Sequence, residues 1–368
     1  MSTPSPVLPR YSAGCLSDII PVLCAPGGPR TVPSWMPGVV QGAPRIVVLL
    51  LDGLGWNQLQ TYAEHMPTLA SMTGGHITTV APSTTATALT SLVTGLSPGE
   101  HGLIGYRVDM GDTVMNVLRW GDENGDLRRR YPPQQTQPCP PFLGSSVPVL
   151  SKAELEGSGF TLAHLDGVKH MGWRAPSSIP VIVREALAAG EDFVYAYYDG
   201  IDKIAHERGF TDHYTAELRA ADNLVANVLS VLPPDTVLIV TADHGQVHVG
   251  DNTIVPMASV TEHVHHQSGE GRFRWLHARR GREGALLDAA RQYDDVAWVV
   301  TKQQVLEENW FGPRVSDAVI RRMGDVALAA HAPVSFEEPL DGGAFDLVCR
   351  HGSLTADEML VPLLALKA

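Results

Sequence analysis

The continuous apolar run Arg45-Ile-Val-Val-Leu-Leu-Leu51 constrains the fold more than any other part of the sequence. It shows none of the alternation between apolar and polar residues that marks a strand with one face in water. Strands buried on both faces belong to parallel sheets that helices cover on each side. Two later segments, residues 192–199 and 236–241, have a similar apolar character. The sequence therefore predicts an α/β fold with a mostly parallel central sheet.

Acidic residues stand where these three strands end. Asp52 follows the first strand, Asp199 and Asp202 follow the second, and Asp243 with His244 follows the third. In open α/β sheets, ligands bind outside the carboxyl ends of the strands. Acids at such positions are more often functional than structural, so we expect a binding site at this edge of the sheet.

A run of hydroxyl residues within Val80–Leu96 predicts the start of a helix. Ser83 or Thr84 can cap it, and Gly95 is a suitable C-terminal stop. A threonine in the first turn, such as Thr85, lies where unpaired backbone N–H groups and the helix dipole favour an anion. Thr85 is therefore a candidate nucleophile for phosphoryl transfer, although capping alone also explains hydroxyl residues at a helix start.

Other elements follow from apolar periodicity and from turn residues. We expect helices at residues 56–72, 179–189 and 212–231, strands at 77–80, 296–301 and 359–366, and a short apolar element at 16–23. Residues 1–44 contain many Pro and Gly and predict an N-terminal arm packed on the core. Residues 45–368 then form a single domain, with a cap or substrate lobe inserted at about 107–180 and a second excursion at about 246–282.

Composition narrows the functional classes. With 368 residues, 44% of them hydrophobic, the chain can bury a sizeable core. A formal net charge of −13 argues against a nucleic-acid polymer as a partner, because backbone phosphates attract clustered Lys and Arg. No apolar run reaches the roughly 18 residues of a membrane span, and no secretory signal is evident, so we expect a cytoplasmic protein. Four scattered cysteines favour reduced thiols: Cys15, Cys24, Cys139 and Cys349.

Imidazole and carboxylate groups form a candidate metal centre. Asp202 and His206 are four residues apart and share one face of a helix. Ligands of these two kinds, without cysteine, suit zinc or a similar divalent ion. Six such residues suffice for two sites of three ligands each, as a two-metal phosphoryl-transfer centre requires. They are Asp52, Asp202, His206, Asp243, His244 and His351.

Several of these assignments have alternatives. Asp199 competes with Asp202, Asp243 can instead cap the turn that follows it, and a lone His351 can be a buried core histidine. A separate histidine cluster is another candidate metal site, although the sequence shows no acid or cysteine at ligand spacing from it. The cluster consists of His263, His265 and His266.

Six motifs occur in a fixed order across residues 46–352 and together resemble a known family. They are Leu51-Asp52-Gly53, the Thr85 helix that runs into Val93-Thr-Gly-Leu96, His101-Gly102, Asp202-x-x-x-His206, Thr241-Ala-Asp-His-Gly245 and His351-Gly352. The chain resembles the alkaline phosphatase superfamily, and within it the type I phosphodiesterase/nucleotide pyrophosphatase family. The resemblance implies an alkaline-phosphatase-like three-layer sandwich for residues 45–368, in which helices flank the central sheet and a cap lobe is inserted.

The resemblance also implies two divalent metal ions, with Zn²⁺ the expected metal. One ion is assigned to Asp202, His206 and His351. The other is assigned to Asp52, Asp243 and His244, with the Thr85 oxygen facing both metals. Thr85 is preferred over Thr84 and Thr87 because it lies eight residues before Val93, the spacing of the family's nucleophile. The implied mechanism is in-line attack by Thr85 on phosphorus, a covalent phosphothreonine, and its hydrolysis.

One position departs from the family pattern. Nucleotide pyrophosphatases carry an asparagine shortly after the His-Gly loop that contacts the phosphoryl oxygen, and Tyr106 stands there in this chain. The expected activity is hydrolysis of a small phosphodiester or nucleotide-like phosphoanhydride, with Tyr106 as a candidate substrate contact. A phosphomonoesterase or phosphomutase on the same bimetal core is an alternative. A catalytically silent zinc protein that binds a phosphorylated partner is an alternative of another class, and the oligomeric state is not predicted.

Overall fold

A computed structural model describes residues 4–24, 32–337 and 347–368. Parts of the expected N-terminal arm, residues 1–3 and 25–31, lie outside the described residues. In the part that is described, the apolar element expected at 16–23 forms a 3₁₀ turn, Leu16–Asp18, and the helix α1, Ile19–Cys24. Leu16, Ile19 and Ile20 are fully buried. This part of the arm therefore contributes to the core.

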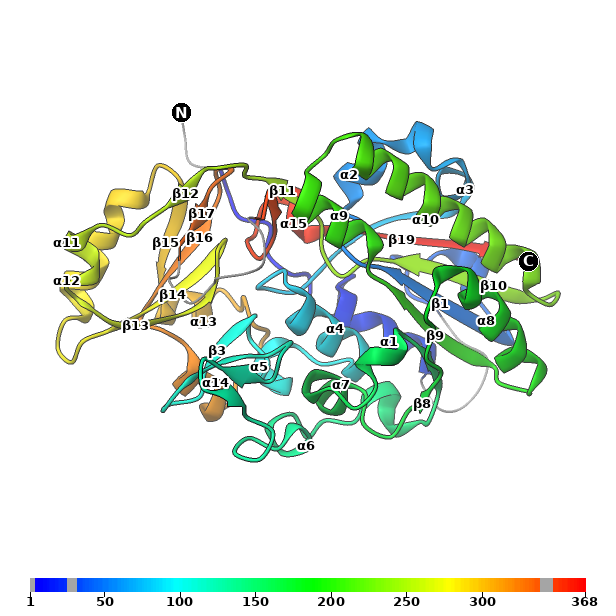
Figure 1. The fold of residues 1–368 in the computed structure, drawn as a ribbon, viewed down its shortest axis with the longest axis horizontal. Coiled ribbons are helices and arrows are strands. Elements are labelled where there is room, and N and C mark those ends of the chain that lie inside the picture. The colour runs from blue at the N-terminus through cyan, green and yellow to red at the C-terminus, as the bar shows by residue number, and fades with distance from the viewer. Residues whose placement is uncertain (1–3, 25–31, 338–346) are drawn as a thin grey trace.

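The central sheet has seven strands in the order β2-β19-β10-β1-β9-β7-β8 (Figure 1). The strand β19 runs antiparallel to β10 and β2, and the other pairs are parallel. The predicted mostly parallel sheet is confirmed. In sequence order the strands are β1 Arg45–Leu51, β2 Thr73–Thr78, β7 Pro148–Leu150, β8 Lys169–His170, β9 Phe193–Tyr198, β10 Thr236–Thr241 and β19 Leu360–Lys367.

Register places the ends of the three buried strands side by side. Leu50 of β1 pairs with Thr241 of β10 on one side and with Tyr197 of β9 on the other. All six side chains that β1 buries between Ile46 and Leu51 are inaccessible to solvent, as a strand covered on both faces requires. The acids that follow these strands therefore emerge at one edge of the sheet.

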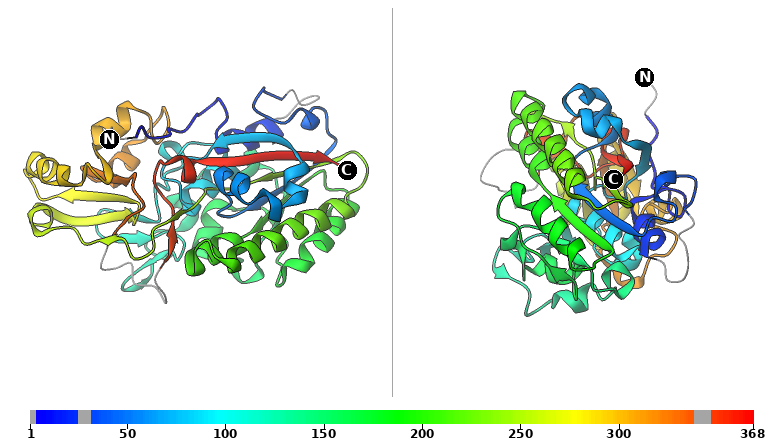
Figure 2. Two further views of the ribbon diagram at one scale, coloured as in Figure 1. Left: turned by 90° about the horizontal axis from the view of Figure 1, so that it is seen from above. Right: turned by 90° about the vertical axis from the view of Figure 1, so that its right-hand side faces the viewer.

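Helices cover both faces of the central sheet, which gives the expected three layers (Figures 1 and 2). On one side α10 packs against α3, α8 and α9, and on the other α4 packs against α1 and α7. These helices are α2 Trp56–Thr61, α3 Pro67–Ser71, α4 Thr85–Thr94, α7 Gly159–His164, α8 Ile179–Ala188, α9 Gly200–Arg208 and α10 Asp212–Val231. The single helix expected at 56–72 is divided, because Pro67 cannot continue a helix and instead starts α3.

A second sheet of eight strands lies beside the first along the long axis of the molecule (Figure 2). Its order is β15-β16-β14-β13-β3-β4-β5-β6. In sequence order the strands are β3 Arg107–Asp109, β4 Val114–Asn116, β5 Gly121–Asp122, β6 Gly125–Asp126, β13 Val264–Glu270, β14 Phe273–Ala278, β15 Ala297–Thr301 and β16 Val326–Ala330. The two excursions expected from the sequence thus join in one sheet, where β3 pairs with β13.

The boundaries of the expected insert differ from the structure. Residues 107–126 belong to the second sheet, whereas β7 and β8 return to the central one. The remaining short elements are α5 Pro98–His101, α6 Pro133–Thr136, β11 Val247–His248, β12 Thr253–Ile254, α11 Ala258–Thr261, α12 Glu283–Ala290, α13 Lys302–Glu307, α14 Asp317–Arg322, β17 Ser335–Phe336, β18 Cys349–Arg350 and α15 Ala356–Met359. In the described ranges no helix combines the length and the apolar character needed to cross a bilayer.

A buried ion pair connects the second sheet to the segment that carries His351. Arg272, in the turn between β13 and β14, donates from Nε and Nη2 to the two oxygens of Glu358, at 2.7 and 2.9 Å. Both side chains are fully buried. Glu358 also accepts a hydrogen bond from the backbone N–H of Ser353, at 2.9 Å. The pair therefore fixes the loop that follows His351.

We expect Arg272→Met to destabilise the fold by about 3–5 kcal/mol, because it leaves the Glu358 carboxylate buried and unpaired. Urea unfolding at pH 7 measures this loss. The matched control is Lys169→Met, which breaks the exposed pair between Lys169 and Glu191 and should cost less than about 1 kcal/mol. Similar losses in the two variants would contradict the structural role of the buried pair.

Candidate metal centre

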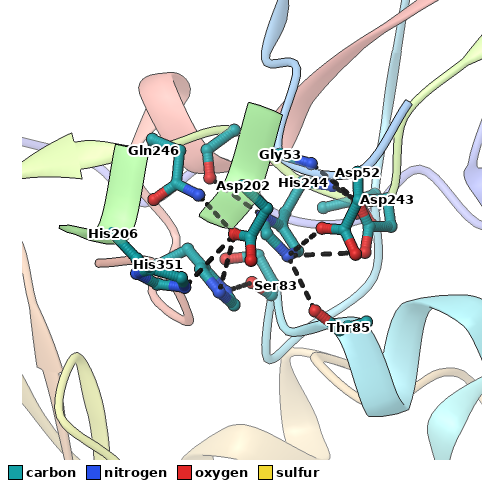
Figure 3. Close-up of polar contacts among 12 residues, drawn as sticks. Asp52, Gly53, Ser83, Thr85, Asp202, His206, Asp243, His244, Gln246 and His351 are labelled. Atoms are coloured by element: carbon teal, nitrogen blue, oxygen red, sulfur yellow. Dashed lines mark hydrogen bonds and ion pairs between the residues drawn. The ribbon is translucent and has the colours of Figure 1, made fainter. Parts of the chain in front are cut away.

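All six predicted ligands and Thr85 come together at the carboxyl edge of the central sheet (Figure 3). Asp52 follows β1, and Asp243 and His244 follow β10. Asp202 and His206 are the third and seventh residues of α9. The remaining two come from the start of α4 and from the loop after β18; they are Thr85 and His351.

The first group of ligands is fully buried. His244 Nε2 lies 3.5 Å from Asp52 Oδ1 and 3.4 Å from Asp243 Oδ2. Ligand atoms from these three residues all fall within 4.8 Å of one another, close enough for one metal ion. The predicted grouping of Asp52, Asp243 and His244 is thus compatible with the structure.

The second group surrounds Asp202. Its Oδ1 lies 3.2 Å from His206 Nε2 and 3.7 Å from His351 Nε2. The ligand atoms of Asp202, His351 and His244 also fall within 4.8 Å of one another, so His244 stands between the two groups. Its ring stacks on that of His351, with centroids 3.5 Å apart. The two predicted ligand sets therefore adjoin each other.

Asp199, the alternative to Asp202, faces elsewhere. Its carboxylate pairs with Lys152 Nζ at 2.8 Å and with Lys203 Nζ at 2.6 Å. Asp202 instead faces imidazoles. The structure therefore favours Asp202, as the four-residue spacing to His206 predicts.

Each of the three histidines is oriented by a main-chain carbonyl. His206 Nδ1 lies 2.6 Å from the carbonyl oxygen of Cys349, His244 Nδ1 3.0 Å from that of Gly245, and His351 Nδ1 2.9 Å from that of Ser83. A proton on Nδ1 leaves the lone pair on Nε2, and Nε2 is the atom that faces the carboxylates in all three residues. This is the usual arrangement around metal-binding histidines.

The electrostatics of the centre also suit a cation. Burial, and then the neighbouring Asp243 and Asp202, raise the pKa of Asp52 well above its ordinary value. Burial raises the pKa of Asp243 as well. For Asp202 burial acts in the same direction, but the imidazoles of His206 and His351 prevail and lower its pKa. Asp52 Oδ1 and Asp243 Oδ2 are buried without a hydrogen-bond partner among the described residues. These residues fit divalent metal ions, which would neutralise the carboxylates and use the unpaired oxygens.

Thr85 occupies the position expected of a nucleophile. It is the first residue of α4, Thr84 is the N-cap, and Gly95 ends the helix in a left-handed conformation with φ of 70°. Thr85 Oγ1 lies 3.1 Å from His244 Nε2. By contrast, the hydroxyls of Thr90 and Thr94 donate to carbonyls of the preceding turn. Thr85 therefore presents its hydroxyl to the ligand groups.

Three residues that support the centre were not predicted as functional. The hydroxyl of Tyr197 donates to Asp52 Oδ2, and Gln246 Nε2 donates to Asp202 Oδ1 at 2.5 Å. Gly53 has φ of 77°, and a Cβ there would lie 2.9 Å from the Cα of Asp202. Tyr197 lies near the end of a strand beside β1, and this position in the sequence could have predicted that its side chain reaches the centre. Gln246 lies only two residues after His244, but nothing in the sequence shows that its amide turns to Asp202.

The His101-Gly102 loop supports α4. His101 is buried, burial lowers its pKa to about 3, and its Nε2 lies 2.8 Å from Ser91 Oγ of α4. Tyr106 is half-buried just before β3, and its carbonyl accepts a hydrogen bond from the N–H of Val117. Its role as a substrate contact stays a prediction.

The sequence model of the type I phosphodiesterase/nucleotide pyrophosphatase family matches residues 46–183 and 181–353. The match includes all six predicted ligands and Thr85. The chain belongs to this family. It is accordingly a hydrolase acting on phosphoric ester bonds. A comparison with curated protein sequences finds no match.

Solved structures share the fold. Human ectonucleotide pyrophosphatase/phosphodiesterase 5 superposes with a TM-score of 0.66, and the murine protein with 0.64; each is 15% identical, over 87% of both chains. Phosphonoacetate hydrolase from Sinorhizobium meliloti 1021, in complex with phosphonoformate, gives 0.60 at 15% identity, over 88% of this chain and 90% of the other. These likenesses confirm an alkaline-phosphatase-like fold for this member of the family.

Asp52→Asn provides a test of the electrostatic argument. Because the pKa of Asp52 is higher in the folded than in the unfolded protein, the ionised form of this carboxyl opposes folding. The metal-free protein therefore loses stability as the pH rises from the unfolded-state pKa of Asp52 to its folded-state pKa. Near pH 8 we expect chelator-treated Asp52→Asn to have a higher Tm than chelator-treated wild type. Its metal affinity should fall by more than the roughly 10–100-fold that loss of an outer-shell partner costs.

Thermal unfolding with and without added Zn²⁺ measures both effects. The control is Asp235→Asn, an exposed carboxylate paired with Lys367, which should alter neither. A metal-free Asp52→Asn protein that is less stable than wild type, yet gains as much from Zn²⁺, would contradict the argument.

Proposed function

We propose that this chain hydrolyses a phosphodiester or phosphoanhydride bond of a small nucleotide-like molecule at a centre of two Zn²⁺ ions, through a covalent phosphothreonine on Thr85. The observation that carries the proposal is the position of Thr85 Oγ1, 3.1 Å from His244 Nε2, which stands between the two groups of ligands. A nucleophile beside two adjoining metal sites is the arrangement that phosphoryl transfer requires.

The ligand chemistry supports the choice of metal. Asp202, His206 and His351 would hold one ion, and Asp52, Asp243 and His244 the other. Mixed carboxylate and imidazole ligands without thiolate suit Zn²⁺. When bound, the two ions lower the pKa of the nucleophile and stabilise negative charge on the phosphoryl oxygens.

The chain's own residues account for the remaining steps. Thr85 Oγ1 gives up its proton to solvent and attacks phosphorus. The bond from Oγ1 to phosphorus forms while the bond from phosphorus to the leaving oxygen breaks in line with the attack, and the leaving oxygen takes up a proton from solvent. Because Thr85 is the first residue of α4, the N–H groups of the first turn have no intrahelical partner and can donate to the non-bridging oxygens. Attack of water on the phosphothreonine then restores the hydroxyl and releases the phosphoryl product.

A nucleotide-like substrate is supported by two considerations. An inactive variant of murine ectonucleotide pyrophosphatase/phosphodiesterase 5, which shares this fold, was solved in complex with AMP. The net charge of −13 disfavours a nucleic-acid polymer, so a small molecule is the proposed substrate. We also propose that the protein works in the cytoplasm.

Tyr106 favours a second candidate function. It stands where nucleotide pyrophosphatases carry an asparagine, and a phenol differs from an amide in reach and in donor geometry. A phosphomonoesterase using the same residues is therefore the alternative. A silent zinc protein, the alternative of another class, would be expected to lack a ligand or the nucleophile, and all seven residues are present.

Replacement of the nucleophile tests the mechanism. We expect Thr85→Ala to lower the turnover of an aryl phosphodiester on the order of 10³-fold or more, with the metal content unchanged. The matched control is Thr87→Val, two residues further along α4. This substitution keeps the volume of a buried side chain, and the Thr87 hydroxyl has no hydrogen-bond partner among the described residues. It should keep turnover within a few-fold of wild type. Undiminished turnover in Thr85→Ala would exclude Thr85 as the nucleophile.

A paired assay separates the two candidate functions. Wild type loaded with Zn²⁺ should hydrolyse an aryl phosphodiester with a higher kcat/KM than the corresponding aryl monoester. Metal analysis on the same sample should give at least about two ions per chain, as the two-metal template implies. Preference for the monoester would favour the phosphomonoesterase, and binding of phosphate without turnover of either ester would favour the silent protein.

A further inference from the structure

A second cluster of metal-ligating side chains lies in the second sheet, away from the residues assigned above. Asp109 ends β3, His266 belongs to β13, and His277 belongs to β14. His266 and His277 face each other across the β13–β14 pair, and β3 is the next strand beside β13 (Figure 1). The cluster thus joins the two excursions that are separate in the sequence.

The sequence suggested a metal site at His263, His265 and His266 without an acid nearby. The structure groups His266 with Asp109 and His277 instead. His265 is exposed on the same strand, and its side chain is not part of the group. Asp109, more than 150 positions earlier in the chain than His266, supplies the carboxylate that the histidine cluster lacked in the sequence.

The distances match a tetrahedral site. Asp109 Oδ2 lies 3.1 Å from His266 Nε2 and 3.4 Å from His277 Nδ1. Two ligand atoms bound to one tetrahedral zinc ion at ordinary bond lengths lie about 3.3–3.5 Å apart. Ligand atoms of all three residues also fall within 4.8 Å of one another. The two printed separations are thus close to those around one zinc ion, and the third ligand atom lies near enough to share it.

Surrounding contacts orient the ligands. His277 Nε2 lies 2.8 Å from Ser268 Oγ, and Asp109 Oδ1 accepts a hydrogen bond from the N–H of Gly111 at 2.7 Å. The atoms left over, His277 Nδ1 and Asp109 Oδ2, are those that converge.

An ion pair and a ring contact already bring the three side chains together. His266 Nε2 lies 3.1 Å from the Asp109 carboxylate and pairs with it. The rings of His266 and His277 stack, with centroids 4.0 Å apart and planes at 17°. His244 and His351 of the candidate metal centre show the same arrangement, at 3.5 Å and 13°.

We propose that Asp109, His266 and His277 bind one further divalent transition-metal ion, of the zinc type, with a water molecule completing the coordination. Two imidazoles and a carboxylate form a donor set that zinc prefers. Such an ion would tie β3 to the β13–β14 hairpin. The site shares no residue with the candidate metal centre.

The test compares the metal content of wild type and four variants after stripping with a chelating resin, reloading with Zn²⁺ and dialysis. His266→Gln and His277→Gln should each hold one ion per chain fewer than wild type. The matched control His265→Gln, an exposed histidine on the same strand, should hold as many as wild type. A His244→Gln protein should lose metal from the candidate metal centre and keep this additional ion.

Anomalous diffraction at the zinc edge from wild-type crystals provides a second measurement that does not depend on the folding of any variant. We expect a peak between Asp109, His266 and His277. Absence of that peak would overturn the proposal, and so would equal metal content in wild type, His266→Gln and His277→Gln. Loss of metal in His244→Gln alone would leave the proposed function standing and remove this site.

Discussion

The cost of burying the carboxylates of Asp52 and Asp243, close to each other and to Asp202, is the constraint on which the arrangement of the centre depends. Asp52 and Asp243 are carried to one edge by neighbouring parallel strands, and Asp202 is brought there by α9, whose backbone N–H at Asp202 donates to the carbonyl of Asp52 at 3.1 Å. Ionised carboxylates so close together in a buried place oppose folding. The surrounding donors offset part of this cost, since Tyr197 donates to Asp52, Gly53 N–H to Asp243 and Gln246 to Asp202. The fold thus preforms a cation-binding site, and the buried carboxylates lower the stability of the metal-free protein.

His351 reaches this edge by a different route, and its position depends on both sheets. The short strand before it, β18, pairs with β11, which follows the His244 loop, and Gly352 forms a bridge with Ser83 just before α4. The loop after it is held by Glu358, whose charge is balanced by Arg272 of the second sheet. The second sheet therefore does more than cover the centre, because it supplies the buried cation that fixes the segment carrying one of the ligands.

Local patterns sufficed to predict much of this centre, and long-range pairing explains what they missed. Short windows of sequence contain three of these patterns. They are the apolar runs before Asp52 and Asp243, the hydroxyl residues at the start of the Thr85 helix, and the spacing of Asp202 and His206. Because parallel strands end at a common edge, these windows also predict that the residues meet.

The pairing of β3 with β13 has no such local signal, so the excursions were expected to be separate and the carboxylate beside His266 was not predicted. The amide of Gln246 was missed for the same reason, because its partner Asp202 lies on another element.

A hydroxyl that faces the ligands distinguishes the two clusters, although their donor chemistry and net charge with metal bound are similar. In the candidate metal centre, two divalent cations would bring four positive charges against three carboxylates, which leaves one net positive charge beside the start of α4. In a chain with a net charge of −13, such a local excess is what draws a phosphoryl anion to one place. The cluster of Asp109, His266 and His277 would also keep one positive charge, but the Ser268 hydroxyl beside it is hydrogen-bonded to His277 Nε2, the ring nitrogen that faces away from Asp109. Hydrolysis therefore belongs to the centre that contains Thr85, while the cluster in the second sheet is suited to holding strands together.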